Sequence, residues 1–372
     1  MKTAHPFVPP AYPYDRLDAA KKLASRHEGG IIELSVGTPC DPPPPMVVRA
    51  LGTSNTERGY PPSLGVEAYR AAAAKWMQRR LGVDIAIHQI AACIGTKEFV
   101  ATTPQYLKLR RPDLDTVLYP AVSYPTYEMG ATLAGCRAVA VPVDAQWRMQ
   151  LDRIDPSDAA RALMLWVNSP GNPTGALDDL DAAAAWGRAR GIPVFSDECY
   201  VEFTWRGPRQ TILSSGTLGV VAVHSLSKRS NLAGARVGFY AGDADLLTYL
   251  GEVRKHVGMM VPGPVQAAAI VAFADDDHVE LQRAVYQARL RRSADIFSAW
   301  ADIEIALPDG GFYLWFKAPG GDAWGFAERV AREGGAIISP GDFYGTAAAE
   351  FVRVAVVQPD DQIELLARRL GV

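Results

Sequence analysis

The stretch from residue 163 to residue 228 constrains the fold most, because buried strands alternate there with a helix. Residues 163–167, 192–195 and 220–223 are short apolar runs of the kind that form interior strands. Between the first two, acidic residues open a segment that ends in Arg188 and Arg190, with Gly191 just beyond, which is typical of a helix. Strand, helix and strand in this order predict a parallel sheet with a right-handed crossover.

A different chemical group follows each of these three strands. Asn172 follows the first, Asp197 and Tyr200 follow the second, and Ser225 and Lys228 follow the third. Open α/β sheets bind their ligands at the carboxyl ends of parallel strands, so we expect these side chains to meet. A lysine in a turn is, by itself, usually a solvated surface residue, and only its neighbours favour a functional role.

These groups together suit pyridoxal 5′-phosphate (PLP). Arg236 lies eight residues after Lys228, and a guanidinium beside the hydroxyls of Ser225 and Ser227 suits a phosphate. A lysine whose pKa is lowered by burial and neighbouring cations suits Schiff-base chemistry. A carboxylate such as Asp197 would keep the pyridine nitrogen protonated, so that the ring accepts electrons.

Composition narrows the alternatives. The chain has 372 residues, 48% of them hydrophobic, which predicts a large core and more than one domain in a soluble protein. A formal net charge of −3 gives no reason to expect nucleic acid or an anionic membrane as partner. The four cysteines form no CxxC pair and the histidines no HExxH motif, so we expect reduced thiols, no metal site and a cytoplasmic location.

Three motifs resemble the fold-type-I, class I/II PLP-dependent aminotransferases over nearly the whole chain: SPGNPTG at 169–175, SDECY at 196–200 and SLSKRSNLAGARVGF at 225–239. The resemblance implies a PLP enzyme in which Lys228 binds the cofactor covalently, Asp197 pairs with the pyridinium nitrogen, and Tyr200 and Asn172 contact the phenolic oxygen. It implies further cofactor contacts through Tyr124 on the ring and through Thr96, Lys97, Ser225, Ser227 and Arg236 at the phosphate. Tyr60 would reach the phosphate of the neighbouring subunit in a homodimer.

Arg353 lies inside an apolar run at 351–356, where a charge is costly unless it meets an anion. From the residues alone, a structural carboxylate is the simpler partner. The resemblance implies instead that Arg353 clamps the α-carboxylate of an amino-acid substrate, with Asn172 beside it and the backbone of Gly37 closing over it.

A narrower resemblance, to actinobacterial-type succinyldiaminopimelate aminotransferases, rests on five blocks: GTPCDPPP at 37–44, SLSKRSNLAG at 225–234, EVRKHVGMMVPGPVQAA at 252–268, SPGDFYG at 339–345 and FVRVA at 351–355. It implies conversion of N-succinyl-2-amino-6-oxopimelate and glutamate into N-succinyl-LL-2,6-diaminopimelate and 2-oxoglutarate, in lysine biosynthesis. Candidate cations for the distal carboxylates are Arg16, Lys97, Arg229, Arg254 and Lys255. Alternatives are an aspartate, alanine or aromatic aminotransferase, or a PLP C–S β-lyase. A PLP-binding ligand sensor of a transcription factor would need a basic winged-helix segment ahead of the domain.

The expected architecture is an α/β fold of the PLP-transferase type I, with a mostly parallel seven-stranded sheet. Residues 1–35 would form an N-terminal arm and part of a small domain, residues 36–258 the large PLP-binding domain, and residues 259–372 the small C-terminal domain. Helices are predicted at 66–81, 99–109, 324–334 and 360–370, and further strands at 116–119, 138–143, 312–316 and 351–356.

Overall fold

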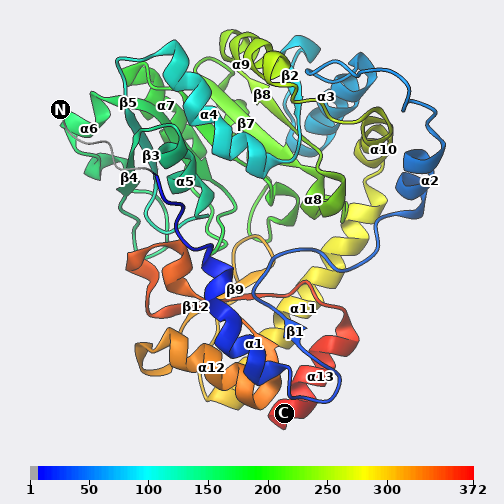
Figure 1. The fold of residues 1–372 in the computed structure, drawn as a ribbon, viewed down its shortest axis with the longest axis vertical. Helices are drawn as coiled ribbons and strands as arrows, with labels where there is room; N and C mark the ends of the chain where they lie inside the picture. The colour runs from blue at the N-terminus through cyan, green and yellow to red at the C-terminus, as the bar shows by residue number, and fades with distance from the viewer. Residues whose placement is uncertain (1–6) are drawn as a thin grey trace.

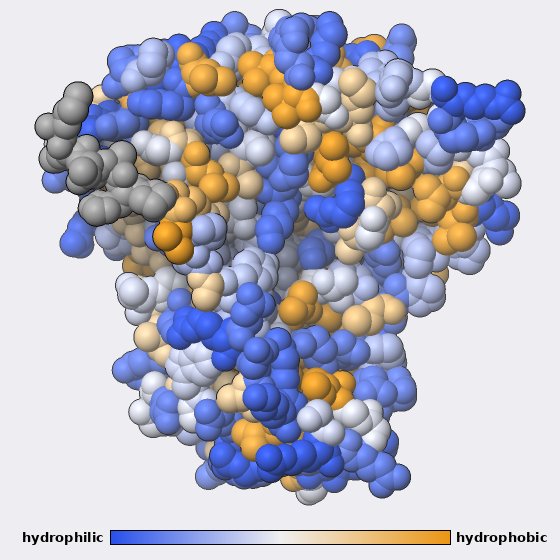
Figure 2. Space-filling view, viewed as in Figure 1, coloured by the Kyte–Doolittle hydropathy of each residue, from blue (hydrophilic) through white to orange (hydrophobic). Residues whose placement is uncertain are grey.

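The computed structural model describes residues 7–372, which form two stacked parts (Figure 1). The upper part contains a seven-stranded sheet with helices on both faces, and the lower part contains small sheets with α1, α11, α12 and α13 around them. On the face shown in Figure 2, hydrophilic residues cover most of the surface and hydrophobic residues occur in small groups.

The seven-stranded sheet has the order β2-β8-β7-β6-β5-β3-β4. Pairing is parallel from β7 to β4, whereas β8 runs antiparallel to both of its neighbours. The predicted mostly parallel seven-stranded sheet is therefore confirmed. The strands are β2 (Ile90–Cys93), β3 (Thr116–Pro120), β4 (Arg137–Val141), β5 (Ala162–Asn168), β6 (Val194–Asp197), β7 (Val220–Ser225) and β8 (Gly238–Gly242).

Alternate residues of these strands enter two separate apolar clusters, because successive side chains of a strand point to opposite faces. On β7, Val220 and Ala222 pack with α3, α7 and α10, whereas Val221 and Val223 pack with α4, α5 and α9. Both faces of the sheet are thus covered, which explains why its strands are continuous apolar runs. The helices of the upper part are α2 (Pro45–Thr53), α3 (Glu67–Leu81), α4 (Thr96–Arg110), α5 (Thr126–Leu133), α6 (Pro156–Ala159), α7 (Leu180–Arg190), α8 (Leu226–Arg229), α9 (Ala244–Val257) and α10 (Gly263–Ala274).

The lower part joins both ends of the described chain. The blue segment near the N-terminus lies beside the orange one, where α1 (Asp18–Ala24) packs on α12 (Ala323–Gly334) (Figure 1). β1 (Ile32–Glu33) pairs with β10 (Ala336–Ile337), and a second sheet has the order β11-β12-β9. The remaining elements are β9 (Tyr313–Lys317), β11 (Ser339–Pro340), β12 (Phe351–Ala355), α11 (Asp277–Ala301) and α13 (Asp360–Leu370). The predicted domain boundaries at residues 35 and 258 stay a prediction. The first long helix after the second boundary, α10, packs against α2 and α3 of the upper part.

The predicted elements exist, with shifted ends. The predicted strand at 192–195 begins only at Val194, since Pro193 has no N–H to donate to the ladder. The predicted helix at 66–81 begins at Glu67, because Val66 has the extended conformation of an N-cap. α7 is capped as its sequence suggests: the side chain of Asp179 accepts a hydrogen bond from the N–H of Ala182, and Gly191 ends it at a φ of 63°. Within residues 7–372, no helix is both long and apolar enough to cross a membrane.

Candidate active site

A cavity of about 370 Å³ opens at the carboxyl ends of β5, β6 and β7, between the two parts of the molecule. The structure brings nearly all the predicted site residues to its wall. They are Gly37, Thr96, Lys97, Tyr124, Asn172, Asp197, Tyr200, Ser225, Ser227, Lys228, Arg236 and Arg353. The volume lies in the range of small-molecule sites.

Lys228 stands in α8, the single helical turn that follows β7. Ser225 caps this turn, and its hydroxyl accepts a hydrogen bond from the N–H of Ser227 at 3.1 Å. The Lys228 ammonium donates a hydrogen bond to the carbonyl of Gly37. Burial lowers the pKa of Lys228 to about 8, and the nearby guanidinium groups of Arg353 and Arg236 act in the same direction. Near neutral pH, Lys228 is therefore more often the neutral, nucleophilic amine than a lysine of ordinary pKa.

Asp197 ends β6 and is buried, with hydrogen-bond donors at both oxygens. The Tyr127 hydroxyl donates to Oδ2 at 2.9 Å, and the N–H of Cys199 donates to Oδ1 at 3.2 Å. Burial raises the pKa of Asp197, while these hydrogen bonds act against the rise. The Asn168 side chain ties the neighbouring loop to this strand end, because it donates to the backbone carbonyl of Asp197 at 2.8 Å and accepts from the N–H of Asn172 at 2.8 Å.

The N-terminus of α4 and Arg236 form an anion cradle. Gly95 has a φ of 74°, and a Cβ there would overlap the Arg236 guanidinium, so only glycine fits. Thr96 opens the helix at this point, where backbone N–H groups and the helix dipole favour a phosphate. The hydroxyls of Ser225 and Ser227 line the same cavity.

Arg353, in β12, is a buried cation with neutral partners. Its guanidinium donates to Asn172 Oδ1 at 2.7 Å, to the Tyr14 hydroxyl at 3.1 Å and to the carbonyl of Ser35, and the ring of Tyr313 lies 4.2 Å away. No carboxylate of residues 7–372 forms a salt bridge with it, and its buried Nε has no partner among them. The structural carboxylate that the residues alone would favour is absent from this part of the chain. A buried guanidinium whose partners are all neutral is suited to binding an anion.

The residues of this cavity fit PLP. The orphaned Nε of Arg353, the anion cradle at Gly95 and the paired carboxylate of Asp197 are the features that a phosphorylated pyridine and a substrate carboxylate require. Within the described residues, no three His, Cys, Asp or Glu side chains are grouped as a metal site would need.

Sequence analysis did not identify several tyrosines of the cavity. Tyr12 and Tyr14 come from the N-terminal arm, Tyr127 from α5 and Tyr313 from β9. The hydroxyls of Tyr200 and Tyr313 lie 2.8 Å apart. A Cβ on Gly37 would overlap the Tyr313 hydroxyl, so the close approach of that loop requires glycine. In the arm, a proline precedes each of two tyrosines in the segment PAYPYD at 10–15, and this was the sequence pattern that could have indicated Tyr12 and Tyr14.

Of the five candidate cations for distal carboxylates, Lys97 lines the cavity, where its ammonium donates to the Tyr12 hydroxyl at 3.0 Å. The prediction is wrong for Arg254, which binds both oxygens of Glu98 at 2.7 and 2.8 Å. It is also wrong for Arg229, which is buried against Glu202. The other two form ion pairs outside the cavity: Arg16 with Asp342, and Lys255 with Glu252.

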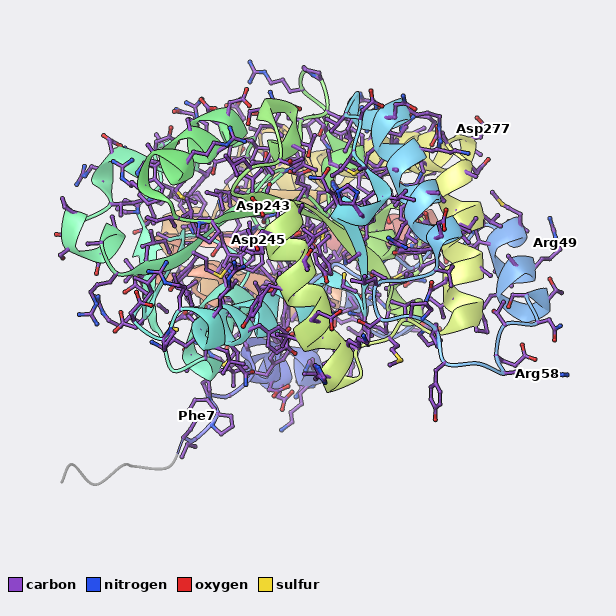
Figure 3. All side chains as sticks on the ribbon, turned by 90° about the horizontal axis from the view of Figure 1, so that it is seen from above. Phe7, Arg49, Arg58, Asp243, Asp245 and Asp277 are labelled. Carbon is purple, nitrogen blue, oxygen red and sulfur yellow. The ribbon has the colours of Figure 1, made fainter. Side chains whose placement is uncertain are left out.

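Tyr60 lies away from this chain's own cavity. It is 98% exposed, in the loop between α2 and α3. Figure 3 shows this loop, marked by Arg58, projecting from the body of the molecule. The prediction that Tyr60 serves a neighbouring subunit stays a prediction.

Comparison with known proteins defines the class. The family model described as aminotransferase class I and II matches residues 29–370, and the chain belongs to this family, whose members depend on PLP. The 4-dedimethylamino-4-oxo-anhydrotetracycline transaminase OxyQ of Streptomyces rimosus is 38% identical, over 97% of this chain and 99% of its own. The LL-diaminopimelate aminotransferase of Aquifex aeolicus is 32% identical, over 98% and 96%. A solved structure of a probable N-succinyldiaminopimelate aminotransferase from Thermus thermophilus superposes with a TM-score of 0.84 at 29% identity, over 96% and 98%.

Proposed function

We propose that this aminotransferase converts N-succinyl-2-amino-6-oxopimelate and glutamate into N-succinyl-LL-2,6-diaminopimelate and 2-oxoglutarate. The observation that carries the proposal is Arg353, whose buried guanidinium shares a cavity with Lys228 and has no carboxylate partner among residues 7–372. The planar guanidinium binds a carboxylate through two parallel hydrogen bonds. A substrate α-carboxylate held there brings its amino group to the same cavity as the Lys228 amine.

The wall residues divide into groups with separate roles in this proposal. PLP supplies the electron sink that stabilises negative charge at the substrate Cα. Asp197 holds the proton on the pyridine nitrogen, and Tyr124 packs on the ring. Tyr200 and Asn172 bind the phenolic oxygen. The phosphate is held by Thr96, Lys97 through its backbone, Ser225, Ser227 and Arg236.

Lys228 is the proposed base. Its Nζ, as the free neutral amine, would take the proton from the Cα of the bound substrate. A pKa of about 8 suits this role, because an efficient base has a pKa near the working pH. The Gly37 carbonyl, which accepts a hydrogen bond from this ammonium, holds the side chain in the cavity.

Lys97 supports an acidic substrate. Its ammonium reaches the cavity on the side of the N-terminal arm, beside Tyr12, and no salt-bridge partner for it occurs in the described part of the chain. After Arg353 has taken the α-carboxylate, Lys97 is left to bind a distal one. Glutamate and the succinylated keto acid both carry such a group.

The test is a donor and acceptor screen on purified protein. The PLP-loaded protein is mixed separately with glutamate, aspartate, alanine, cysteine and LL-diaminopimelate, while the cofactor spectrum and the keto acids are followed. We expect glutamate to convert the cofactor and the succinylated keto acid to restore it. Pyruvate and sulfide from cysteine would favour the β-lyase. Alanine or aspartate turned over as efficiently as the proposed pair would leave only the general aminotransferase activity.

The relatives define a second candidate. OxyQ and the LL-diaminopimelate aminotransferases bear names with other substrates, so LL-diaminopimelate belongs in the same screen. Faster turnover of LL-diaminopimelate than of the succinylated product in the reverse direction would replace the proposed substrate with that one.

A further inference from the structure

Two adjacent buried carboxyl groups lie at the end of β6, and they face different surroundings. Asp197 lines the cofactor cavity and has hydrogen-bond donors at both oxygens. Glu198 is 1% exposed, and its Oε1 accepts a hydrogen bond from the N–H of Ile212 at 2.8 Å. Its Oε2 has no hydrogen-bond partner among the described residues.

His224, on β7, faces this unpaired oxygen. Its Nε2 lies 3.4 Å from Glu198 Oε2, and neither ring nitrogen has a hydrogen-bond partner within residues 7–372. The ring is buried between aromatic neighbours, edge-on to Trp76 at 5.0 Å and tilted against Phe239 at 4.9 Å. A carboxyl oxygen and an imidazole, both without hydrogen-bond partners among the described residues, thus lie next to each other.

A small cavity separates this pair from the cofactor site. Its volume is about 10 Å³, roughly the space for one water molecule, and Glu198, His224 and Glu202 contribute to its wall. Cys199 and Ser225 line both this cavity and the larger one. The pair therefore lies directly behind the surface that faces the cofactor.

We propose that Glu198 is protonated and that its O–H donates a hydrogen bond to Nε2 of His224. Asp197 is then the ionised member of the two adjacent carboxyl groups. The hydrogen-bond partners of the two carboxyl groups support this assignment. An ionised carboxylate needs donors, which Asp197 has at both oxygens, whereas a protonated acid needs an acceptor, which an imidazole nitrogen provides. Two neighbouring carboxylates in a buried site do not both ionise readily, and their surroundings decide which one holds the proton.

The electrostatics agree with this division. Burial raises the pKa of Glu198 to about 8, against the hydrogen bond that the N–H of Ile212 donates, and the neighbouring Asp197 raises it further. Burial lowers the pKa of His224 to about 3, although Glu202 acts against this. A protonated acid beside a neutral imidazole carries no net charge. Asp197 is thus spared a second negative charge behind it.

Glu198 and His224 act as positioning residues in this proposal, which rests on the role proposed for Asp197. Each is next in sequence to a proposed cofactor-binding residue, since Glu198 follows Asp197 and His224 precedes Ser225. A hydrogen bond between them fixes the ends of β6 and β7 relative to each other. This hydrogen bond thereby keeps the Asp197 carboxylate at a fixed distance from the anion cradle.

Infrared spectroscopy of the protein without cofactor tests the protonation directly. We expect a protonated-carboxyl band at pH 7 that disappears as the pH rises through about 8. The band should be missing from Glu198→Gln and retained in Asp197→Asn and in the exposed control Glu252→Gln. A wild type without the band, or a Glu198→Gln protein that keeps it, overturns the assignment.

The positioning role is tested by PLP affinity. Glu198→Gln keeps a neutral donor for His224, so its Kd for PLP should stay within about threefold of wild type from pH 6 to pH 8. His224→Leu removes the acceptor and should raise the Kd by about tenfold, and His224→Gln, which restores one, should recover most of it. His256→Phe, at an exposed site, is the matched control.

The outcomes separate this proposal from the proposed function. Wild-type affinity in His224→Leu overturns the positioning role. PLP binding to Asp197→Asn with unchanged affinity and spectrum would remove Asp197 from its proposed role, while the infrared assignment, made without cofactor, would stand. If Glu198→Gln does not fold, the assignment depends on the carboxyl band shifting in His224→Leu and returning in His224→Gln, and an unmoved band overturns it.

Discussion

Replacing Arg353 with glutamine tests the centre of the proposed function. The glutamine keeps a hydrogen-bonding group in the pocket but removes the charge and the guanidinium fork. In the free protein Arg353 is 1% exposed and is held by Asn172, Tyr14 and the carbonyl of Ser35, all of them neutral. The substitution therefore deletes a binding group for an anion without leaving a buried carboxylate unpaired.

The expected loss follows from the contacts that the fork can make. A bidentate carboxylate gives two charge-assisted hydrogen bonds, each contributing about 1.5–3 kcal/mol. Their sum of about 3–6 kcal/mol corresponds to a fall in kcat/KM for glutamate of between about 10²-fold and 10⁴-fold. Stability should change little, because a buried cation without a carboxylate partner is costly and the rings of Tyr313 and Tyr344 compensate only part of that cost.

The assay compares glutamate with 4-aminobutyrate, which has the same distal carboxylate but no α-carboxylate. The reaction of glutamate should collapse in Arg353→Gln, whereas the slow reaction of 4-aminobutyrate should stay within about threefold of wild type. Arg291→Gln, at an exposed position of α11, is the matched control. Thermal unfolding confirms that the variants are folded.

Equal losses for the two amines would refute the reasoning, since they would show that Arg353 supports the site as a whole. A glutamate reaction that falls less than about tenfold would mean that another group binds the α-carboxylate. A large drop in the unfolding temperature would assign the guanidinium a structural role.

Three further predictions concern the same cavity. Lys228→Ala should stay folded and lose transamination together with any borohydride-reducible PLP adduct. In the wild type, covalent incorporation of PLP should rise with pH through about 8, because the neutral amine reacts and the pKa of Lys228 is lowered from 10.5. Lys97→Gln should lower kcat/KM for glutamate by between about tenfold and 150-fold and leave alanine nearly unaffected, a selectivity that equal losses would contradict. Tyr60→Phe should weaken PLP retention, and hybrid dimers with Lys228→Ala should regain one active site; inactive verified hybrids would place Tyr60 outside the neighbouring site.

The sequence predicted the part of the site that follows from strand order. β5, β6 and β7 are apolar runs whose carboxyl ends carry Asn172, Asp197 and Lys228, and parallel pairing brings such ends together. The spacing along the chain was enough because each functional group lies within a few residues of its strand. The parallel α/β sheet and the fit to PLP followed from this local information, whereas the fold type and the seven strands came from the family resemblance.

Contacts between distant segments could not be predicted in this way. Tyr14 reaches Arg353 from 339 residues away, and Tyr127 reaches Asp197 from 70 residues away. Their positions depend on how the arm and α5 pack, which no local pattern specifies. The same reason explains the errors at Arg229 and Arg254, because Glu202 and Glu98 become their partners only in the folded chain.

The charge of the cavity connects the cofactor with the choice of substrate. Lys97, Lys228, Arg236 and Arg353 contribute four cations to its wall, and Asp197 is the one acidic side chain that the described residues place there. In the proposed function, the PLP phosphate would neutralise Arg236, a substrate α-carboxylate would neutralise Arg353, and Lys228 would act as a neutral amine. Lys97 would then be the remaining cation of the wall, and it would favour a second anionic group of the substrate. If Lys97 binds the distal end of the substrate as proposed, a carboxylate without an ammonium group beside it, as in glutamate and the succinylated keto acid, would bind there better than the zwitterionic end of LL-diaminopimelate.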